Sequence, residues 1–289
     1  MLKIIEKSKI WISISLIIIV LGLGFICFKG LNFGIDFKGG TQVSIQLNEN
    51  ISKEDADAVV KEYAPDSSTT ISNTYEYEIK STDLDSDKLS SIMNDLEEKY
   101  SLEDSALLSQ EEIGAAIGKE LTRNSLLAIL AASAVMLVYV AIRFEFKFGV
   151  AALIATLHDV LVTITVYAVF GIPVNTPFIA AILTIVGYSM NDTIVIFDRI
   201  RENLKKMRRA NTVEVANTSI TETLTRSINT SLSTLVTIIA INILVPSVRE
   251  FTIPLIVGIV CGAYSSIFIA SPVWVFLKEK TGKKKVKNA

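Results

Sequence analysis

The sequence predicts an α-helical membrane protein with one small α+β domain outside the membrane. Half of the 289 residues are hydrophobic, and these residues are collected into long runs rather than spaced at helical or strand period. A run of about 20 apolar residues is long enough to cross the hydrocarbon core as a helix. Six runs qualify: 10–28, 124–142, 148–171, 176–197, 227–248 and 251–277.

The first run follows three lysines, as the apolar part of a signal peptide would. It has no small-residue cleavage site and is long for such a segment, so we expect residues 1–28 to stay as a cytoplasmic N-terminus and a first membrane helix. Cys27 and Cys261 both fall inside apolar runs. We therefore expect neither a disulfide nor a metal site.

The distribution of Lys and Arg predicts that both termini are cytoplasmic, since basic residues are enriched in cytoplasmic segments. Seventeen basic residues lie in the four segments that this topology places inside: 1–9, 143–147, 198–225 and 278–289. Residues 29–123 have nine basic and twenty acidic residues. We expect an acidic extracytoplasmic domain at 29–123, membrane helices 2–6 at 124–277, a basic cytoplasmic loop at 198–226 and a basic tail at 278–289.

Strand and helix patterns alternate within 29–123. The predicted elements are strands at 41–47, in the stretch 69–81 and near 105–110, and helices at 52–64 and 85–100. Ser52 is a suitable N-cap for the first helix, and Pro65 follows its end. These elements predict a small α+β sandwich of the ferredoxin-like kind between the first and second membrane helices.

The connections to the membrane helices have patterns of their own. A helical pattern runs from Ile113 into the second apolar run without a break, so this helix is either a simple tether or a rigid element that transmits a tilt. Pro254 and Pro272 bracket the sixth run, where we expect kinks. Residues 199–225 are basic and amphipathic, and we expect them to lie along the inner membrane face.

Three ionisable side chains at membrane depth are the candidate functional residues. A charge at the bilayer centre costs about 2.5–3.5 kcal/mol on insertion scales, and such residues are usually paired or functional. Asp159 lies about 16 Å into the third helix, near the midplane. Asp192 lies near the inner end of the fourth helix and Arg226 at the start of the fifth, so antiparallel packing would bring these two together. We predict a proton relay of Asp192, Arg226 and Asp159.

Polar neighbours support this prediction, and structural alternatives remain. Tyr188 and Asn191 lie beside Asp192. His158 precedes Asp159, but its helical direction differs by ~100°, so we assign it a supporting or packing role. The less favoured alternative for Asp192 is a static ion pair with Arg226 or an extension of the side chain toward water, and for Asp159 a purely structural pairing stays level with the relay.

No soluble catalytic constellation competes with this interpretation. The sequence has one histidine, no metal-spaced cluster, no phosphate-binding loop and no nucleophile elbow. We expect no enzyme, no cofactor, no bound metal and no nucleic-acid partner. If the chain does work, the transmembrane gradient must supply it, at about 2.3 kcal/mol for one charge moved through 100 mV.

Three motifs resemble the SecF members of the SecD/SecF family. They are "FGIDFKGGT" (33–41), "AAIGKEL" (115–121) and "VGYSMNDTIVIFDRIREN" (186–203), and the likeness covers nearly the whole chain. Met190 stands where the family motif would have Leu, a mild change. The resemblance implies one half of a resistance-nodulation-division transporter in the bacterial cytoplasmic membrane, among membrane lipids.

The resemblance also implies partners and roles. The chain would pair with SecD, dock on the SecYEG channel and use proton flow to help preproteins emerge. Asp192 and Arg226 match family positions implicated in proton passage, and Asp36, Gly39 and Gly40 match a motif at the membrane-to-domain junction. Two other interpretations stay open: a passive membrane scaffold for SecD and the channel, and half of a proton-driven lipid or drug exporter.

Overall fold

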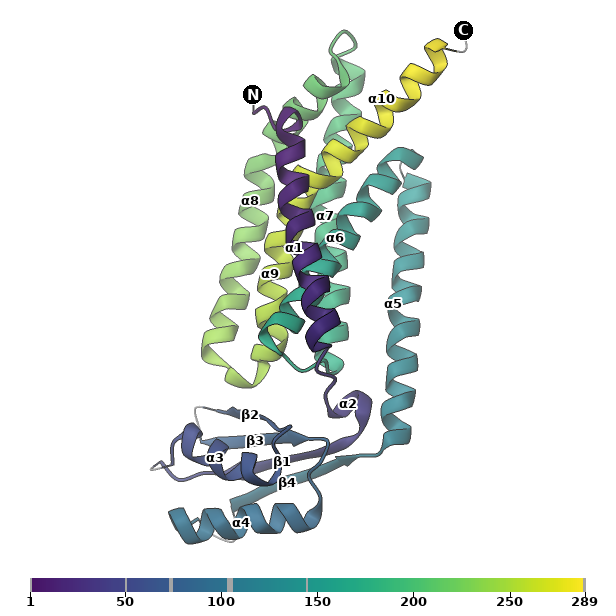
Figure 1. Ribbon diagram of the computed structural model, residues 1–289. Helices are drawn as coiled ribbons and strands as arrows, with labels where there is room; N and C mark the ends of the chain where they lie inside the picture. The colour runs from purple at the N-terminus through teal and green to yellow at the C-terminus, as the bar shows by residue number, and fades with distance from the viewer. Residues whose placement is uncertain (1, 50, 73–74, 103–105, 144, 288–289) are drawn as a thin grey trace.

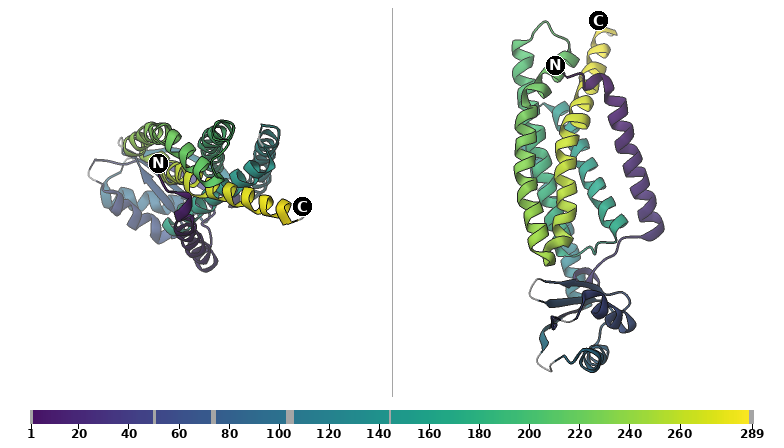
Figure 2. Two further views of the ribbon diagram at one scale, coloured as in Figure 1. Left: turned by 90° about the horizontal axis from the view of Figure 1, so that it is seen from above. Right: turned by 90° about the vertical axis from the view of Figure 1, so that its left-hand side faces the viewer.

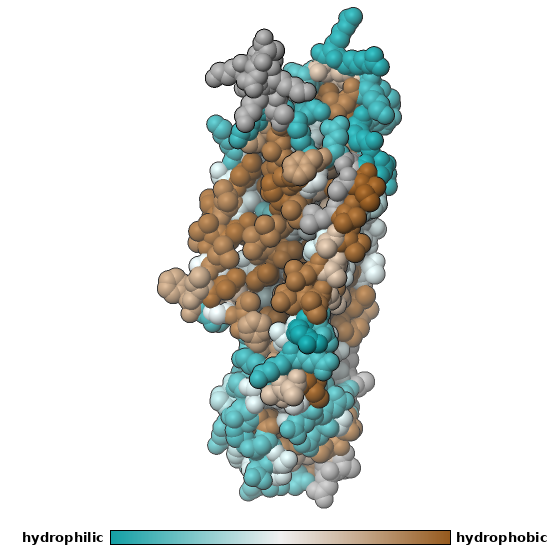
Figure 3. Space-filling view, turned by 90° about the vertical axis from the view of Figure 1, so that its right-hand side faces the viewer, coloured by the Kyte–Doolittle hydropathy of each residue, from teal (hydrophilic) through white to brown (hydrophobic). Residues whose placement is uncertain are grey.

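The protein consists of a bundle of long helices with a small α+β unit at one end (Figure 1). The computed structural model describes residues 2–49, 51–72, 75–102, 106–143 and 145–287. Within them, six helices are long and apolar enough to cross a membrane, which confirms the six predicted spans. Figure 3 shows a broad hydrophobic band across the bundle, with hydrophilic surface at both ends.

The first five spans are single helices and the sixth is divided. They are α1 (Ser8–Lys29), α5 (Ala115–Arg143), α6 (Phe146–Phe170), α7 (Thr176–Lys206), α8 (Thr212–Leu244), and then α9 (Arg249–Ser265), the π-helical segment η4 (Ser266–Ala270) and α10 (Ser271–Lys287). Both termini and the turn between α7 and α8 lie at the end of the bundle opposite the α+β unit (Figure 1 and Figure 2).

The α+β unit has the chain order β-α-β-β-α-β. Its elements are β1 (Gly40–Gln46), α3 (Lys53–Tyr63), β2 (Ser68–Ile71), β3 (Glu76–Ser81), α4 (Ser86–Tyr100) and β4 (Leu107–Ile113). The sheet order is β2-β3-β1-β4, and every pair is antiparallel. Ser52 caps α3, as predicted, by accepting a hydrogen bond of 3.2 Å from the Asp55 amide. The predicted closing strand is β4, although residue 105 lies outside the described residues.

One face of the sheet forms the core of this unit. Val43 and Ile45 of β1 and Tyr77 and Ile79 of β3 are fully buried, because alternate strand residues point to the same face. Helices α3 and α4 cover that face with the apolar side chains Ala56, Val60, Ile92 and Leu96. The unit therefore has a hydrophobic core of its own.

The bundle has central and peripheral helices. In α6 and in α7, half of the residues in the most apolar stretch of the helix are buried, and in the divided sixth span more than half are. In α1 and α5 almost none of the corresponding residues are buried. Aromatic rings pack together between the central helices: Phe148 is tilted against Phe197 and stacked on Trp274, with ring centroids 4.9 and 5.0 Å apart. The candidate functional residues on α6 and α7 are thus shielded by neighbouring helices.

The prediction that residues 199–225 form one segment lying along the inner membrane face is wrong. Residues 199–225 instead extend α7 and α8 beyond the apolar runs, and residues 207–211 join them. Arg199 Nε donates to Glu222 Oε2 at 2.6 Å, and Asn203 Nδ2 donates to Ser219 Oγ at 3.0 Å. These contacts between the two helices stabilise them as a hairpin, so most of the expected loop at 198–226 is helical.

The sixth span is interrupted at only one of its two prolines. Pro254 lies inside α9 without ending it. Pro272, near the start of α10, follows the π-helical segment η4 directly. Proline has no N–H to give to the preceding turn, which is one cause of helix irregularity.

Candidate functional site

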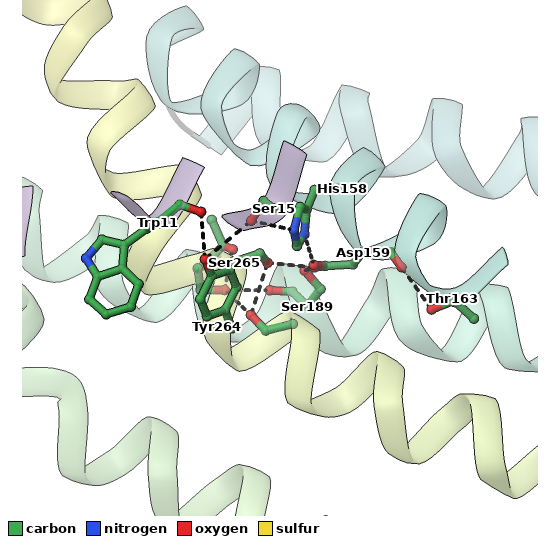
Figure 4. Close-up of polar contacts among 11 residues, drawn as sticks. Trp11, Ser15, His158, Asp159, Thr163, Ser189, Tyr264 and Ser265 are labelled. Atoms are coloured by element: carbon green, nitrogen blue, oxygen red, sulfur yellow. Dashed lines mark hydrogen bonds and ion pairs between the residues drawn. The ribbon is translucent and has the colours of Figure 1, made fainter. Parts of the chain in front are cut away.

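Asp159 lies at the centre of a buried hydrogen-bond cluster (Figure 4). Its side chain is fully buried. Oδ2 accepts hydrogen bonds from Ser189 Oγ of α7 at 2.5 Å and from Ser265 Oγ of α9 at 2.7 Å. Oδ1 lies 2.8 Å from Nδ1 of His158. Three helices of the bundle therefore meet at one carboxyl group.

The cluster continues from His158 to α1. His158 Nε2 lies 3.0 Å from Ser15 Oγ, which lies 3.3 Å from the hydroxyl of Tyr264. The Tyr264 hydroxyl in turn donates to the carbonyl of Trp11 at 2.9 Å. Although consecutive helical residues point ~100° apart, the imidazole reaches the neighbouring carboxyl group. His158 is thus a direct partner of Asp159, whereas only a supporting or packing role was predicted for it from the sequence.

Asp192, on α7, is the second buried acid. Its side chain is 2% exposed, and Ser231 Oγ of α8 donates to Oδ2 at 3.4 Å. Thr193 beside it is hydrogen-bonded to Ser266 of η4 at 2.7 Å; Ser266 Oγ donates to the Gly262 carbonyl at 2.8 Å and lies 3.3 Å from the Ser189 carbonyl oxygen. The irregular segment η4 therefore links the surroundings of the two carboxylates.

Arg226 does not form the expected ion pair with Asp192. Its side chain is exposed, and no nitrogen–oxygen distance between these two described residues falls within 4.0 Å. Ser231, the α8 residue that faces Asp192, is five positions further along, which places Arg226 about 7.5 Å away along the axis and ~140° around it. The guanidinium is still near enough to interact electrostatically with the carboxylate.

The supporting residues beside Asp192 separate in the structure. Asn191 is exposed and points away from the buried side of α7. Among the described residues, neither the buried hydroxyl of Tyr188, one helical turn before Asp192, nor that of Ser227 of α8 has a hydrogen-bond partner. Buried hydroxyls are normally paired with protein or water, so the vicinity of Asp192 has unused hydrogen-bonding capacity.

The junction residues lie far from both carboxylates, between the α+β unit and the bundle. Asp36, in the short helix α2 (Ile35–Lys38), accepts a hydrogen bond of 2.7 Å from the Thr176 amide in the first turn of α7. Gly39 and Gly40 have φ values of +86° and +151°, where other residues are strained. A Cβ on Gly40 would lie 2.5 Å from the Ser81 carbonyl oxygen. The junction therefore requires glycine for its close backbone approach.

Several residues of the cluster were not singled out from the sequence. Ser15, Tyr264 and Ser265 lie within apolar runs, in "WISISL" and "GAYSSIF". Small residues in the second stretch indicated close helix packing. The hydroxyl groups in the same stretch were the available signal for a polar cluster. Among the described residues, no group of three or more His, Cys, Asp or Glu side chains is placed to hold a metal ion.

Comparison with known proteins identifies the family. The family model described as protein export membrane protein SecD/SecF, C-terminal, matches residues 92–280, and the SecD/SecF GG motif model matches residues 24–50. The chain belongs to the SecD/SecF family. It is 40% identical to the protein translocase subunit SecF of Sebaldella termitidis over 98% of this chain and 96% of that protein.

Fused relatives of the SecD/SecF family match in sequence and in structure. The chain is 38% identical to the protein translocase subunit SecDF of Thermus thermophilus over 92% of this chain and 37% of that protein. The crystal structure of SecDF from that organism superimposes with a TM-score of 0.82 at 36% identity, covering 96% of this chain and 39% of the other. The chain thus spans about two fifths of SecDF.

These relatives establish the general role of the chain. They are named as translocase subunits, which are not known enzymes, and the family acts in protein export. In the SecDF relatives the matched region is part of one longer polypeptide, which indicates that this chain associates with SecD. Together with six apolar helices, the family makes this a multi-pass membrane protein.

Proposed function

We propose that the chain is the SecF-type subunit of a proton-driven export machine, which works with SecD on preproteins leaving the SecYEG channel. One observation supports this proposal above the others. Asp159 and Asp192 are buried on adjacent central helices, and neither is neutralised by a Lys or Arg within ion-pair distance among the described residues. A buried charge without a cation is costly, and proton uptake removes that cost.

Asp192 is the main proton-exchanging residue in this proposal. The unpaired hydroxyls of Tyr188 and Ser227 provide polar groups near its part of the α7–α8 interface, as a proton path requires. Arg226 acts through its field rather than by a direct bond. Asp159 participates through the polar residues Ser189, Ser266 and Thr193, which connect the two levels of α7.

The proposed orientation places the α+β unit outside the bacterial cytoplasmic membrane. Both termini and the turn at 207–211 lie at the other end of the bundle, where the basic segments are concentrated (Figure 1). Basic residues favour the cytoplasmic side. The unit outside then has the chain order of a ferredoxin-like fold, directly joined to the membrane helices that would move it.

Exchange of Asp192 for asparagine tests the proposal. Asp192→Asn keeps size and hydrogen bonding but removes titration, so we expect proton conduction by vesicles containing this chain and SecD to fall at least about tenfold, together with preprotein export. Asp198→Asn is the matched control, because Asp198 is on the same helix but half-exposed and paired with Arg143 at 3.3 Å. Full conduction and export in Asp192→Asn would instead support a passive scaffold.

A further inference from the structure

The hydrogen bonds that lead away from Asp159 end at a group that can only accept. The Trp11 carbonyl accepts from the Tyr264 hydroxyl. A phenol has a single proton to donate, so the contact between Tyr264 and Ser15 requires Ser15 to be the donor. The serine hydroxyl has then used its one proton as well.

This direction assigns a proton to each side of the imidazole. Ser15 Oγ must accept the 3.0 Å hydrogen bond from His158, so Nε2 is protonated. The 2.8 Å contact between Nδ1 and Asp159 Oδ1 also needs one proton, because an unprotonated Nδ1 and a carboxylate oxygen are both acceptors. That proton belongs either to an imidazolium or to a carboxylic acid. In both forms the pair binds one proton more than a neutral histidine beside an ionised aspartate.

We infer that the His158–Asp159 pair is a proton-binding site separate from Asp192, and that Ser15 and Tyr264 are positioning residues that favour its protonated form. This inference deepens the proposed function. Proton binding by the pair does not depend on that function, but the use of the proton in export does. Ser15 is 4% exposed and His158 7% exposed, so bulk water does not substitute for these partners. Packed rings of Trp11, Tyr264 and Phe268 cover the cluster, with centroids 4.4 Å (Trp11–Phe268) and 5.0 Å (Tyr264–Phe268) apart.

Among the described residues, no Lys or Arg side chain lies within ion-pair distance of this pair. The other titratable groups that face it are the Cys261 thiol and the Tyr264 phenol, both on α9. From α1 and α7 the facing groups are the hydroxyls of Ser15 and Ser189, and η4 has no titratable side chain. The proton count of the pair therefore sets its net charge, which is zero when protonated and minus one after release.

Release of the proton reverses one hydrogen bond. When the pair gives a proton to water, the remaining imidazole proton occupies Nδ1 and faces the carboxylate, and Nε2 becomes an acceptor. Ser15 then donates to Nε2 and can no longer donate to Tyr264. The Ser15–Tyr264 contact, at 3.3 Å, is the longest in the chain of hydrogen bonds. Because it joins α1 to α9, the protonation state of the pair is coupled to the contact between these helices.

The single histidine of the sequence makes a site-specific test possible. The full chain, labelled with ¹⁵N-histidine and prepared without a polyhistidine tag, is placed in lipid vesicles, and nitrogen NMR follows both ring nitrogens between about pH 5 and 8. We expect Nε2–H at low pH, and loss of that proton with Nδ1–H retained at high pH. Tyr264→Phe frees the Ser15 hydroxyl for Nε2, so the transition should move down by about half to one pH unit.

Two further variants complete the test. Ser13→Ala, on the exposed side of the same helix, should leave the transition in place. In a Ser15→Ala background Tyr264→Phe should have no further effect, because the link between the two residues is already gone. A histidine that stays singly protonated on Nδ1 over the whole range, or a transition that Tyr264→Phe does not move, overturns the inference. Proton conduction by Asp192→Asn is measured separately, so failure of the proposed function is distinguishable.

Discussion

At the scale of single residues, the partners of the two buried acids are of a kind that permits a change of protonation. Asp159 and Asp192 are held by serine hydroxyls and an imidazole. A hydroxyl can donate to a carboxylate or accept from a carboxylic acid, whereas Lys and Arg can only donate. An ion pair with Arg226 would favour the ionised form alone. The observed arrangement is therefore compatible with both states of each acid.

Asp57 in the α+β unit shows the opposite arrangement. Burial raises the pKa of its carboxyl group, but hydrogen bonds from Lys53, Thr69 and Tyr77 together outweigh burial and hold the pKa below its usual value. Lys53 Nζ lies 2.6 Å from Oδ2. This acid stays ionised at neutral pH and stabilises the fold.

The shifted pKa of Asp57 predicts a pH dependence of stability. Because the folded-state pKa is the lower one, the stabilisation is present above the unfolded value of about 3.9 and is lost as the pH falls through the folded value. Asp57→Asn should lower the stability of the unit by about 1–2 kcal/mol at pH 7 and have little effect at about pH 2. Hydrogen exchange of β1 and β3 in the full chain measures this change.

An exposed acid on the neighbouring helix is the control for Asp57. Asp87 lies in the first turn of α4 and is exposed. Asp87→Asn should alter hydrogen exchange in β1 and β3 by less than about 0.5 kcal/mol at any pH. An equal effect of the two substitutions would show that the hydrogen bonds of Asp57 contribute nothing special.

The buried acids were predictable from the sequence, and their hydroxyl partners were not. Residues 160–191 contain no acidic or basic side chain, so Asp159 and Asp192 stand out on either side of them. Hydroxyls in helices commonly donate to the carbonyl four residues earlier, as Thr165 and Thr230 do here at 2.9 Å. Sequence spacing does not distinguish such residues from Ser15, which bonds across to another helix.

At the scale of elements, apolar runs determined the membrane helices but not where they end. A helix that leaves the membrane continues wherever tertiary contacts stabilise it. The α7–α8 hairpin depends on such contacts, including that of Arg199 with Glu222. Their partners are about 20 residues apart in the sequence and become neighbours only in the folded hairpin. Sequence position likewise does not show which residues of α8 face α7, and for this reason Arg226 was expected to pair with Asp192.

Close packing of α9 on α7 maintains the Asp159 cluster. A Cβ on Gly262 would lie 3.1 Å from the Cα of Ser189, which is tight for a contact with backbone. Gly262→Ala should push the two helices apart by a few tenths of an ångström and weaken the hydrogen bonds of Ser189 and Ser265 to Asp159. We expect export to fall about threefold to tenfold, for a loss of about 1 kcal/mol.

A second glycine provides the comparison for Gly262. Gly187 lies on α7, and an added Cβ there would meet no atom within 4 Å. Gly187→Ala should leave export unchanged and slightly stabilise the helix, by about 0.5–1 kcal/mol. Unchanged export in both variants would show that the spacing of α7 and α9 does not matter for function.

At the scale of the whole molecule, the α+β unit meets the bundle through few contacts and incomplete packing. An open groove of about 320 Å³ lies between them, with Thr69 of β2 on one side and Pro173 and Arg249 on the other. Ser68 Oγ donates to Glu250 Oε1 at 3.3 Å across the interface. Only Gly114 separates β4 from α5, so the sheet and this membrane helix are directly connected. Small polar interfaces of this kind permit relative motion.

Relative motion of the α+β unit predicts the effect of a cross-link at this interface. Ser68→Cys with Glu250→Cys, in a chain whose free cysteines Cys27 and Cys261 are first replaced, places one thiol on each side of this interface. If the unit must leave the bundle during export, oxidation should reduce export at least about tenfold, and a reductant should restore it. Electrophoresis after cleavage between the two positions measures the fraction cross-linked.

The single-cysteine variants separate the cross-link from the substitutions themselves. Each removes one partner of the Ser68–Glu250 contact, so the interface weakens by an amount typical of one partly exposed hydrogen bond, about 0.5–1.5 kcal/mol. Their export should therefore respond neither to oxidant nor to reductant. If the oxidised double variant exports normally while most of it is cross-linked, the unit works without leaving the bundle at this edge. Any coupling to α7 would then act through Asp36 and the first turn of that helix.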